Sequence, residues 1–274
     1  MLPGYRRCHS ACRSLQRSGA AAPSSARAFG DAVTPSTLRQ PLHITGLLWL
    51  LAPLWYLLCE AVTAAAFDGY NYAHFYISDL GVAEHGDFEG RMLASQVPEV
   101  MNAGFIGSGL LFLLGLCTLW PYLAGGASRW WFLGVGALHA VGITFVGLVP
   151  GSPANAASGL MTIHVAGAIA AIIGGNLTAI LSRFALGEFF AGSGARLIGP
   201  ALGSLGLLSA FMLVMHALVP DGVSERGAVY PFFAWQFFTA IALLRIPLAA
   251  ASDARTLTSA AGLQAASRSR GQRR

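Results

Sequence analysis

The feature that most constrains this sequence is an uncharged stretch, because no Asp, Glu, Lys or Arg occurs from Trp130 to Ser182. A membrane-spanning helix needs about 20 mostly apolar residues, so the stretch is too long for a single span. A Pro-Gly-Ser-Pro sequence at 150–153 interrupts it, and such residues break helices. The stretch therefore predicts two spans, near residues 129–149 and 160–183.

Four further apolar segments are long enough to cross a bilayer. They lie near residues 42–66, 101–120, 197–219 and 229–250. The chain is 55% hydrophobic and only 11% charged, whereas a soluble domain carries about 25% charged residues. Because so little charge is available to cover a water-facing surface, we expect an all-α fold, a polytopic transmembrane bundle of six helices over residues 41–251.

Both ends of the chain are expected to be disordered basic tails, over residues 1–40 and 252–274. The N-terminal tail is rich in Arg, Ser and Ala and contains no apolar run, which is typical of disorder. Its composition also resembles an organelle transit peptide, although a disordered basic tail or an over-extended start site explains it better. Whether residues 1–38 belong to the mature protein stays open at this point.

The arginines predict the orientation, since the chain has no lysine. With the N terminus inside, fifteen of the 17 arginines fall on the inner side, and only Arg91 and Arg226 fall outside. Cytoplasmic loops carry an excess of basic residues, so we expect both termini in the cytoplasm of a bacterium and the spans in its plasma membrane. This placement indicates membrane topology rather than nucleic-acid binding. Membrane lipids are the expected partners, and no protein partner is indicated.

Several short motifs follow one another along the spans. They are ISDLG at 77–81, VGLVPGS at 146–152, IHVAGA at 163–168 and SERGAVYPFFAWQF at 224–237. In this order they resemble the prokaryotic six-helix membrane proteins called domain of unknown function 998 (DUF998). The resemblance covers roughly residues 42–250. It implies a fold and a membrane location, but no established catalytic residue, because the family is itself largely uncharacterised.

Ionisable groups inside a membrane are costly and are candidates for function. On the predicted topology, several ionisable groups converge on the outer half of the bundle. Glu60, His164 and His216 lie inside the spans, with His139 deeper, and the loops above carry His74, Asp79, Asp221, Glu225 and Arg226. Glu60 should lie about six residues below the outer end of its span, and His164 and His216 about one turn inside. The sequence therefore predicts a polar pocket near the outer leaflet.

Three interpretations of this pocket stay open. The first is structural or lipid-binding, with the polar groups bonding across helices and fixing the loops. The second is a metal-dependent lipid hydrolase, in which His164, His216 and Asp79 bind zinc and Glu60 acts as the base, although the sequence has no HExxH motif. The third is a proton-coupled carrier of small solutes, because histidines titrate near neutral pH and relay protons.

The candidate residues follow from these interpretations, and whether the protein is an enzyme is left open. The candidate catalytic residues are Glu60, Asp79, Glu225 and Arg226. The candidate metal ligands are His164, His216 and Asp79. No cofactor motif is evident, and zinc is the cofactor that these residue types would suit.

Overall fold

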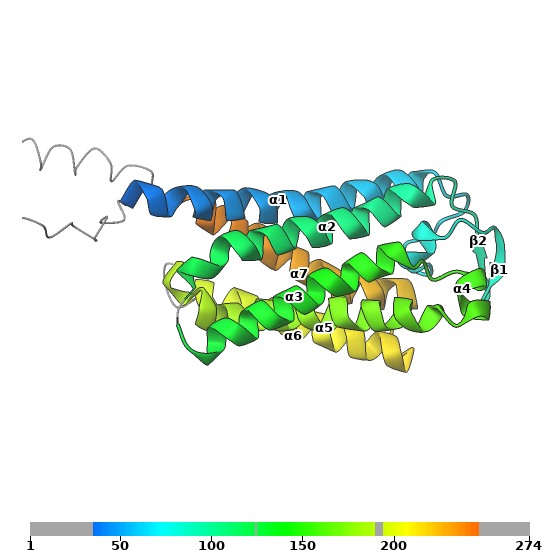
Figure 1. The fold of residues 1–274 in the computed structure, drawn as a ribbon. Coiled ribbons are helices and arrows are strands. Elements are labelled where there is room, and N and C mark those ends of the chain that lie inside the picture. The colour runs from blue at the N-terminus through cyan, green and yellow to red at the C-terminus, as the bar shows by residue number, and fades with distance from the viewer. Residues whose placement is uncertain (1–34, 124, 190–193, 247–274) are drawn as a thin grey trace, which may run out of the picture. The chain divides into compact units, whose positions relative to one another are not determined.

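The computed structural model describes residues 35–123, 125–189 and 194–246, which Figure 1 traces in colour. The predicted C-terminal tail and most of the predicted N-terminal tail lie outside these ranges. The last residues of the N-terminal tail differ from the prediction, because the first helix already begins at Pro35. Proline suits the first turn of a helix, where its missing N–H would have no partner.

Six long apolar helices correspond to the six predicted spans. They are α1 (Pro35–Ala65), α2 (Pro98–Leu119), α3 (Ala127–Leu148), α5 (Met161–Ala185), α6 (Ala195–Met215) and α7 (Asp221–Leu244). All six are long and apolar enough to cross a membrane, which confirms the predicted fold class. Short helical turns occur between them: η1 (Ser78–Gly81), η2 (Trp120–Tyr122), α4 (Pro153–Ser158) and η3 (Gly187–Phe189).

The end of the fifth span and the beginning of the sixth differ from the prediction. α6 stops at Met215 because His216 takes a left-handed backbone conformation, with φ 47°. α7 begins at Asp221, well before the predicted residue 229. The sequence predicts a water-facing loop for the charged residues of its first turns. In the structure these residues lie on the helix and form hydrogen bonds there.

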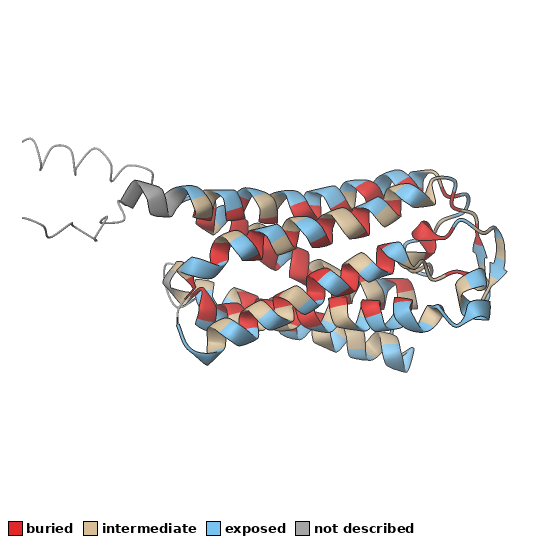
Figure 2. Ribbon diagram, viewed as in Figure 1, coloured by how far each residue is buried: buried red, intermediate tan, exposed pale blue. Residues whose placement is uncertain are grey.

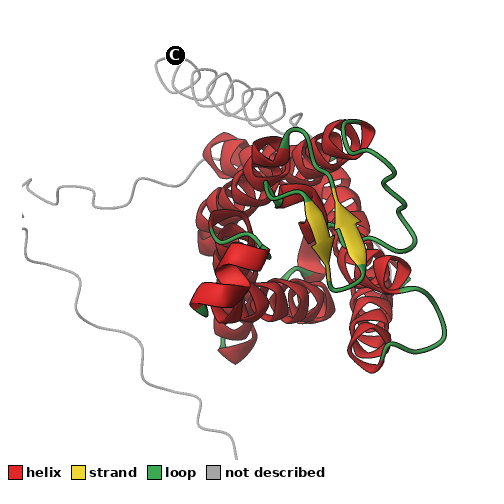
Figure 3. Cartoon of the chain, turned by 90° about the vertical axis from the view of Figure 1, so that its right-hand side faces the viewer, coloured by secondary structure: helices red, strands yellow, loops and turns green. Residues whose placement is uncertain are grey.

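The six helices contact one another in the order α1, α2, α3, α5, α6, α7 and back to α1, which closes a ring. Figure 3 looks along the helices from the side on which the two strands lie. Residues 66–97, 149–160 and 216–220 connect helices at one end of this ring, which we call the loop end. The start of α1 and the end of α7 meet at the opposite end, where His43 Nε2 lies 3.1 Å from the carbonyl oxygen of Ile246. The two ends of the six-helix region therefore lie on the same side, as an even number of spans requires.

Aromatic side chains fill the interior of the ring. Trp49 of α1 stacks on Phe112 of α2, with ring centroids 5.1 Å apart, and lies 5.4 Å from Trp235 of α7. The Trp49 indole N–H donates to the carbonyl oxygen of Phe112 at 3.1 Å, so its polar atom is satisfied. These contacts join α1, α2 and α7 at the centre of the bundle.

Small residues such as Gly199 and Gly203 let α6 approach α5 closely. A Cβ placed on Gly203 would lie 2.4 Å from the Asn176 carbonyl oxygen, and one on Gly206 only 1.9 Å from the Asn176 side-chain oxygen. Transmembrane helices pack through such small residues because lipid supplies no hydrophobic force between helices. Gly206 extends this close contact by one further turn.

The outward faces of the helices are exposed, as the pale blue of Figure 2 shows. Large hydrophobic side chains such as Leu110, Leu138 and Phe211 are exposed there. A soluble protein seldom exposes so much apolar surface, whereas a bilayer favours it. α6 is the least buried span, with 17% of its most apolar window buried against 44–50% in the other five.

A small β-hairpin lies over the loop end and was not predicted. β1 (Gly86–Phe88) pairs antiparallel with β2 (Arg91–Leu93). The turn between them has positive φ at both Glu89 (52°) and Gly90 (76°), as a two-residue hairpin turn requires. Strands of three residues are too short to show the alternating pattern by which strands are detected in sequence.

Candidate functional site

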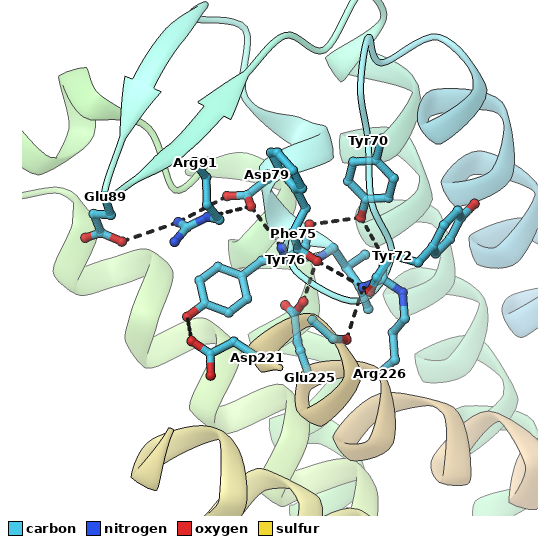
Figure 4. A network of polar contacts seen from close by, with 12 residues as sticks. Tyr70, Tyr72, Phe75, Tyr76, Asp79, Glu89, Arg91, Asp221, Glu225 and Arg226 are labelled. Carbon is cyan, nitrogen blue, oxygen red and sulfur yellow. Dashed lines mark hydrogen bonds and ion pairs between the residues drawn. The ribbon is translucent and has the colours of Figure 1, made fainter. Parts of the chain in front are cut away.

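The loop end is organised around the guanidinium of Arg226, in the second turn of α7. Arg226 is only 8% exposed, and its Nη1 donates to the carbonyl oxygens of Tyr72 (2.8 Å), Phe75 (3.0 Å) and Gly222 (3.1 Å). Its Nη2 donates to the Tyr70 hydroxyl. The guanidinium therefore holds the α1–α2 connection against α7, as Figure 4 shows.

A buried ion pair joins Arg226 to the first span. Arg226 Nε donates to Glu60 Oε1 at 3.1 Å, and the Tyr230 hydroxyl lies 2.9 Å from both Glu60 oxygens. Glu60 is only 2% exposed. A buried charge pair is tolerated when further hydrogen bonds satisfy its remaining atoms, and Tyr230 supplies them. Glu60 lines neither of the two cavities described below, and its hydrogen bonds go to Arg226 and Tyr230 of α7.

A second charged cluster lies under the hairpin. Asp79 Oδ2 accepts from Arg91 Nε at 2.8 Å and from the backbone N–H of Tyr76 at 2.9 Å. The Arg91 guanidinium also covers the Tyr76 ring, 4.3 Å from its centroid, and bonds to Glu89. Burial raises the pKa of Asp79 above its ordinary value, although Arg91 and the Tyr76 amide act in the opposite direction.

Asp221 ties this cluster to the α6–α7 connection. Its Oδ2 accepts from the Tyr76 hydroxyl at 2.9 Å and lies 2.8 Å from His216 Nδ1. Burial raises the pKa of Tyr76, and so does its hydrogen bond to Asp221. His216 caps the end of α6 and its side chain is 68% exposed, whereas the sequence had placed it one turn inside a span.

Glu225 binds the next backbone amide along the loop. Its Oε2 accepts from the N–H of Ile77 at 2.5 Å, directly after the Tyr76 amide that Asp79 holds. Two carboxylates, one from η1 and one from α7, thus bind consecutive amides of the same connection. The difference between them is that Asp79 has an arginine partner.

A groove of about 630 Å³ lies between α5 and α6 beneath the hairpin. Its polar residues gather at the loop end: Tyr76, Ser78, Asp79, Glu89, Arg91, His164, His216 and Glu225. Its apolar residues continue along the two helices: Val165, Ile169 and Ile173 of α5, and Ala210, Leu213 and Val214 of α6. Ile169 is 54% exposed and Val214 68% exposed, so this apolar part opens onto the outer surface of the bundle.

A smaller cavity of about 50 Å³ lies inside the ring, next to the groove. Its volume is enough for a few water molecules. Tyr56, His139 and Asn176 line its deeper part. His164 and Glu225 line both spaces and therefore stand at the junction between groove and inner cavity.

His139 of α3 and His164 of α5 both bind backbone carbonyls. His164 Nδ1 lies 2.8 Å from the carbonyl oxygen of Val149, and His139 Nδ1 lies 2.8 Å from that of Ala171. In the neutral imidazole these bonds place the proton on Nδ1 and leave Nε2 as the acceptor. The carbonyls thereby fix the tautomer and the orientation of each ring.

The structure brings the candidate catalytic residues together but gives them different surroundings. Glu60 and Arg226 are occupied with each other and with the loop, whereas Asp79 and Glu225 face the groove. The three candidate zinc ligands, Asp79, His164 and His216, also line the groove. Within the described ranges, no three His, Cys, Asp or Glu side chains are arranged to hold a metal ion. The zinc site stays a prediction.

Sequence reasoning missed the tyrosines that complete these clusters. Tyr70, Tyr76 and Tyr230 each donate a hydroxyl hydrogen bond within them. The aromatic-rich sequence FDGYNYAHFYISDLG at 67–81 is the available signal for them. Arg91 was assigned only to the outer side, yet it is the partner of Asp79.

Comparison with known proteins adds one finding. A family model described as "Protein of unknown function (DUF998)" matches residues 50–242, most of the six-helix region. No curated protein and no solved structure matches the chain.

Proposed function

The chain belongs to the DUF998 family of proteins of unknown function, and on this premise we propose that it binds a membrane lipid in the groove between α5 and α6. The observation that carries the proposal is the division of the groove lining. Charged and hydroxyl side chains lie at the loop end, and only apolar side chains of α5 and α6 continue from it. A molecule that matches both parts must be amphiphilic.

The size and the opening of the groove support the same ligand class. Ligand pockets in proteins measure about 300–1,000 Å³, and this groove measures about 630 Å³. Exposed apolar residues such as Ile169 and Val214 form its open side, where acyl chains of the bilayer would lie. A lipid could therefore enter sideways, with its head among the polar residues and its chains along the two helices.

The polar network explains how the groove keeps its shape. Arg226 holds the α1–α2 connection, and Asp221 ties the α6–α7 connection to the same loop through Tyr76. Both connections border the polar end of the groove. The buried ion pair therefore serves the site indirectly, by fixing the loop that carries Asp79.

The experiment that tests lipid binding fills the groove with a larger side chain. Ala210 lines it from α6, and the A210W variant should place an indole where acyl chains lie. Lipids retained by the purified full chain would be counted by native mass spectrometry. The matched control is A201W, since Ala201 is exposed on the same helix and lies outside the groove. We expect A210W to lose the retained lipid and A201W to keep it; equal retention would contradict the proposal.

We further propose that the spans lie in a bacterial plasma membrane with both termini in the cytoplasm, on the strength of the arginine distribution. The hydrolase and carrier interpretations stay predictions. In the hydrolase interpretation, the groove would hold a substrate rather than a resident lipid. The inner cavity beside the groove, with His139 and His164 in its wall, is the feature that the carrier interpretation would use.

A further inference from the structure

Glu225 is the carboxylate of the groove that lacks a cationic partner. Among the described residues, no Arg or His nitrogen lies within ion-pair distance of it. Its Oε2 accepts one hydrogen bond, from the Ile77 amide. A carboxylate that is partly removed from water is costly unless it is paired, so this position favours an additional cation.

The two arginines nearest to Glu225 are already bound. Arg226, its neighbour in sequence, is held by Glu60 and by the loop carbonyls of Tyr72 and Phe75. Arg91 is held by Asp79 and covers the Tyr76 ring. Neither can turn to Glu225 without leaving a buried carboxylate unpaired, which would cost more than it gains.

The charges that line the groove also favour an additional cation. Three carboxylates line its polar end, those of Asp79, Glu89 and Glu225, against the single arginine Arg91. An anionic head alone would meet more negative than positive charge there. A head that carries a positive group opposite Glu225 would balance the charge.

We propose that Glu225 receives the primary ammonium group of an aminophospholipid whose chains occupy the groove. This inference rests on the proposed lipid binding and names the lipid class. Glu225 lines both the groove and the inner cavity, so an ammonium held there sits at the innermost polar point of the groove. Charge-assisted N–H···O bonds of this kind are among the stronger hydrogen bonds in proteins.

The residues around Glu225 favour a primary ammonium over a quaternary one. A primary ammonium has three N–H donors, and the acceptors beside Glu225 include the hydroxyl of Ser78, which lines the same two spaces. A quaternary ammonium has no N–H and is recognised instead by open aromatic faces. Two aromatic rings line this end, those of Tyr76 and Phe88, and the Tyr76 ring is already covered by Arg91.

The test is a competition between lipids with identical acyl chains. The purified full chain in detergent would be offered equal amounts of phosphatidylethanolamine, phosphatidylcholine and phosphatidylglycerol, and the bound species counted by native mass spectrometry. We expect phosphatidylethanolamine to be preferred about tenfold, which corresponds to one charge-assisted hydrogen bond. The E225Q variant should lose this preference. The control E99Q should keep it, since Glu99 is exposed on α2 and lies outside the groove.

A second series varies the lipid and leaves the protein unchanged. Adding one, two and three methyl groups to the ethanolamine nitrogen removes its N–H donors in turn, so retention by the wild-type chain should fall at each step. Equal retention across the series, or an unchanged preference in E225Q, would overturn the assignment of Glu225. The proposed function would then still stand if A210W loses all lipids; if A210W retains them, lipid binding in the groove itself is wrong.

Discussion

The Glu60 carboxylate of α1 and the Arg226 guanidinium of α7 lie 3.1 Å apart and join the first and last spans of the ring at the loop end. Both residues are buried, and the Tyr230 hydroxyl completes the bonding of the carboxylate. Arg226 in turn holds the loop that carries Asp79. One ion pair thus connects helix packing with the architecture of the groove.

Removing Glu60 should destabilise the bundle. In E60A the Arg226 guanidinium stays buried without its anionic partner. Such an unpaired buried charge lowers the free energy of unfolding by about 3–5 kcal/mol. For a chain of this size the thermal midpoint should fall by roughly 10 °C. The measurement is thermal unfolding in detergent, with E99A as control because Glu99 is exposed. Equal midpoints for E60A and E99A would show that the ion pair does not hold the spans together.

A methyl group on Gly222 should push the loop away from α7. A Cβ there would lie 2.5 Å from the Phe75 carbonyl oxygen and 2.7 Å from that of Tyr72, the same oxygens that Arg226 binds. We expect G222A to lose about 1–3 kcal/mol of unfolding free energy and to be cleaved faster by protease within residues 66–97. G134A is the matched control, since nothing lies within 4 Å of a Cβ at Gly134. Loop cleavage at the same rate in both variants would contradict the close fit.

The fold was largely predictable from the sequence, because a span is specified by its own composition and length. α3 and α5 begin and end within a few residues of their predicted bounds. α7 was predicted too short because Glu225 and Arg226 were expected in water. The partners that allow them on the helix, such as Glu60, lie far away in the sequence.

The candidate site was predictable as a set of residues, and less so as a set of contacts. The cost of ionisable groups in a membrane identifies Glu60 and His164. It could not show that Arg226 pairs with Glu60 and Arg91 with Asp79, because these ion pairs depend on how the loop folds. The groove between α5 and α6 depends on helix packing, which apolar periodicity does not encode.

Asp79 should give the loop a characteristic dependence on pH. Its pKa is raised above the ordinary value of 3.8, chiefly by burial. Asp79 thus has a higher pKa in the folded chain than in the unfolded chain. At a pH between these two values, the folded chain holds a proton that the unfolded chain has released, so the free energy of unfolding falls as pH rises. The thermal midpoint of wild type minus that of D79N should therefore decrease as pH is raised from about 4 through this window. D87N, which removes an exposed carboxylate of β1, is the control, and a difference that rises with pH would contradict the assignment.

The predicted orientation places the start of α1 and the end of α7 in the cytoplasm. Fluorescent-protein and alkaline-phosphatase fusions at each terminus report the two sides of a bacterial plasma membrane. Both termini should give fluorescence and no phosphatase activity. Phosphatase activity of a fusion at either terminus would contradict this topology. The polar end of the groove would then lie at the inner leaflet.

The most direct test of the central claim, that the groove between α5 and α6 holds a lipid, is photolabelling in a bilayer. Phosphatidylethanolamine with a photoreactive group in its acyl chain would be crosslinked to the full chain, and the adducts mapped by mass spectrometry. The account predicts adducts concentrated on Ile169, Ile173 and Val214, which line the groove, and their loss in A210W. Adducts spread evenly over exposed residues of other helices, such as Leu110 and Leu138, and unchanged in A210W would contradict it.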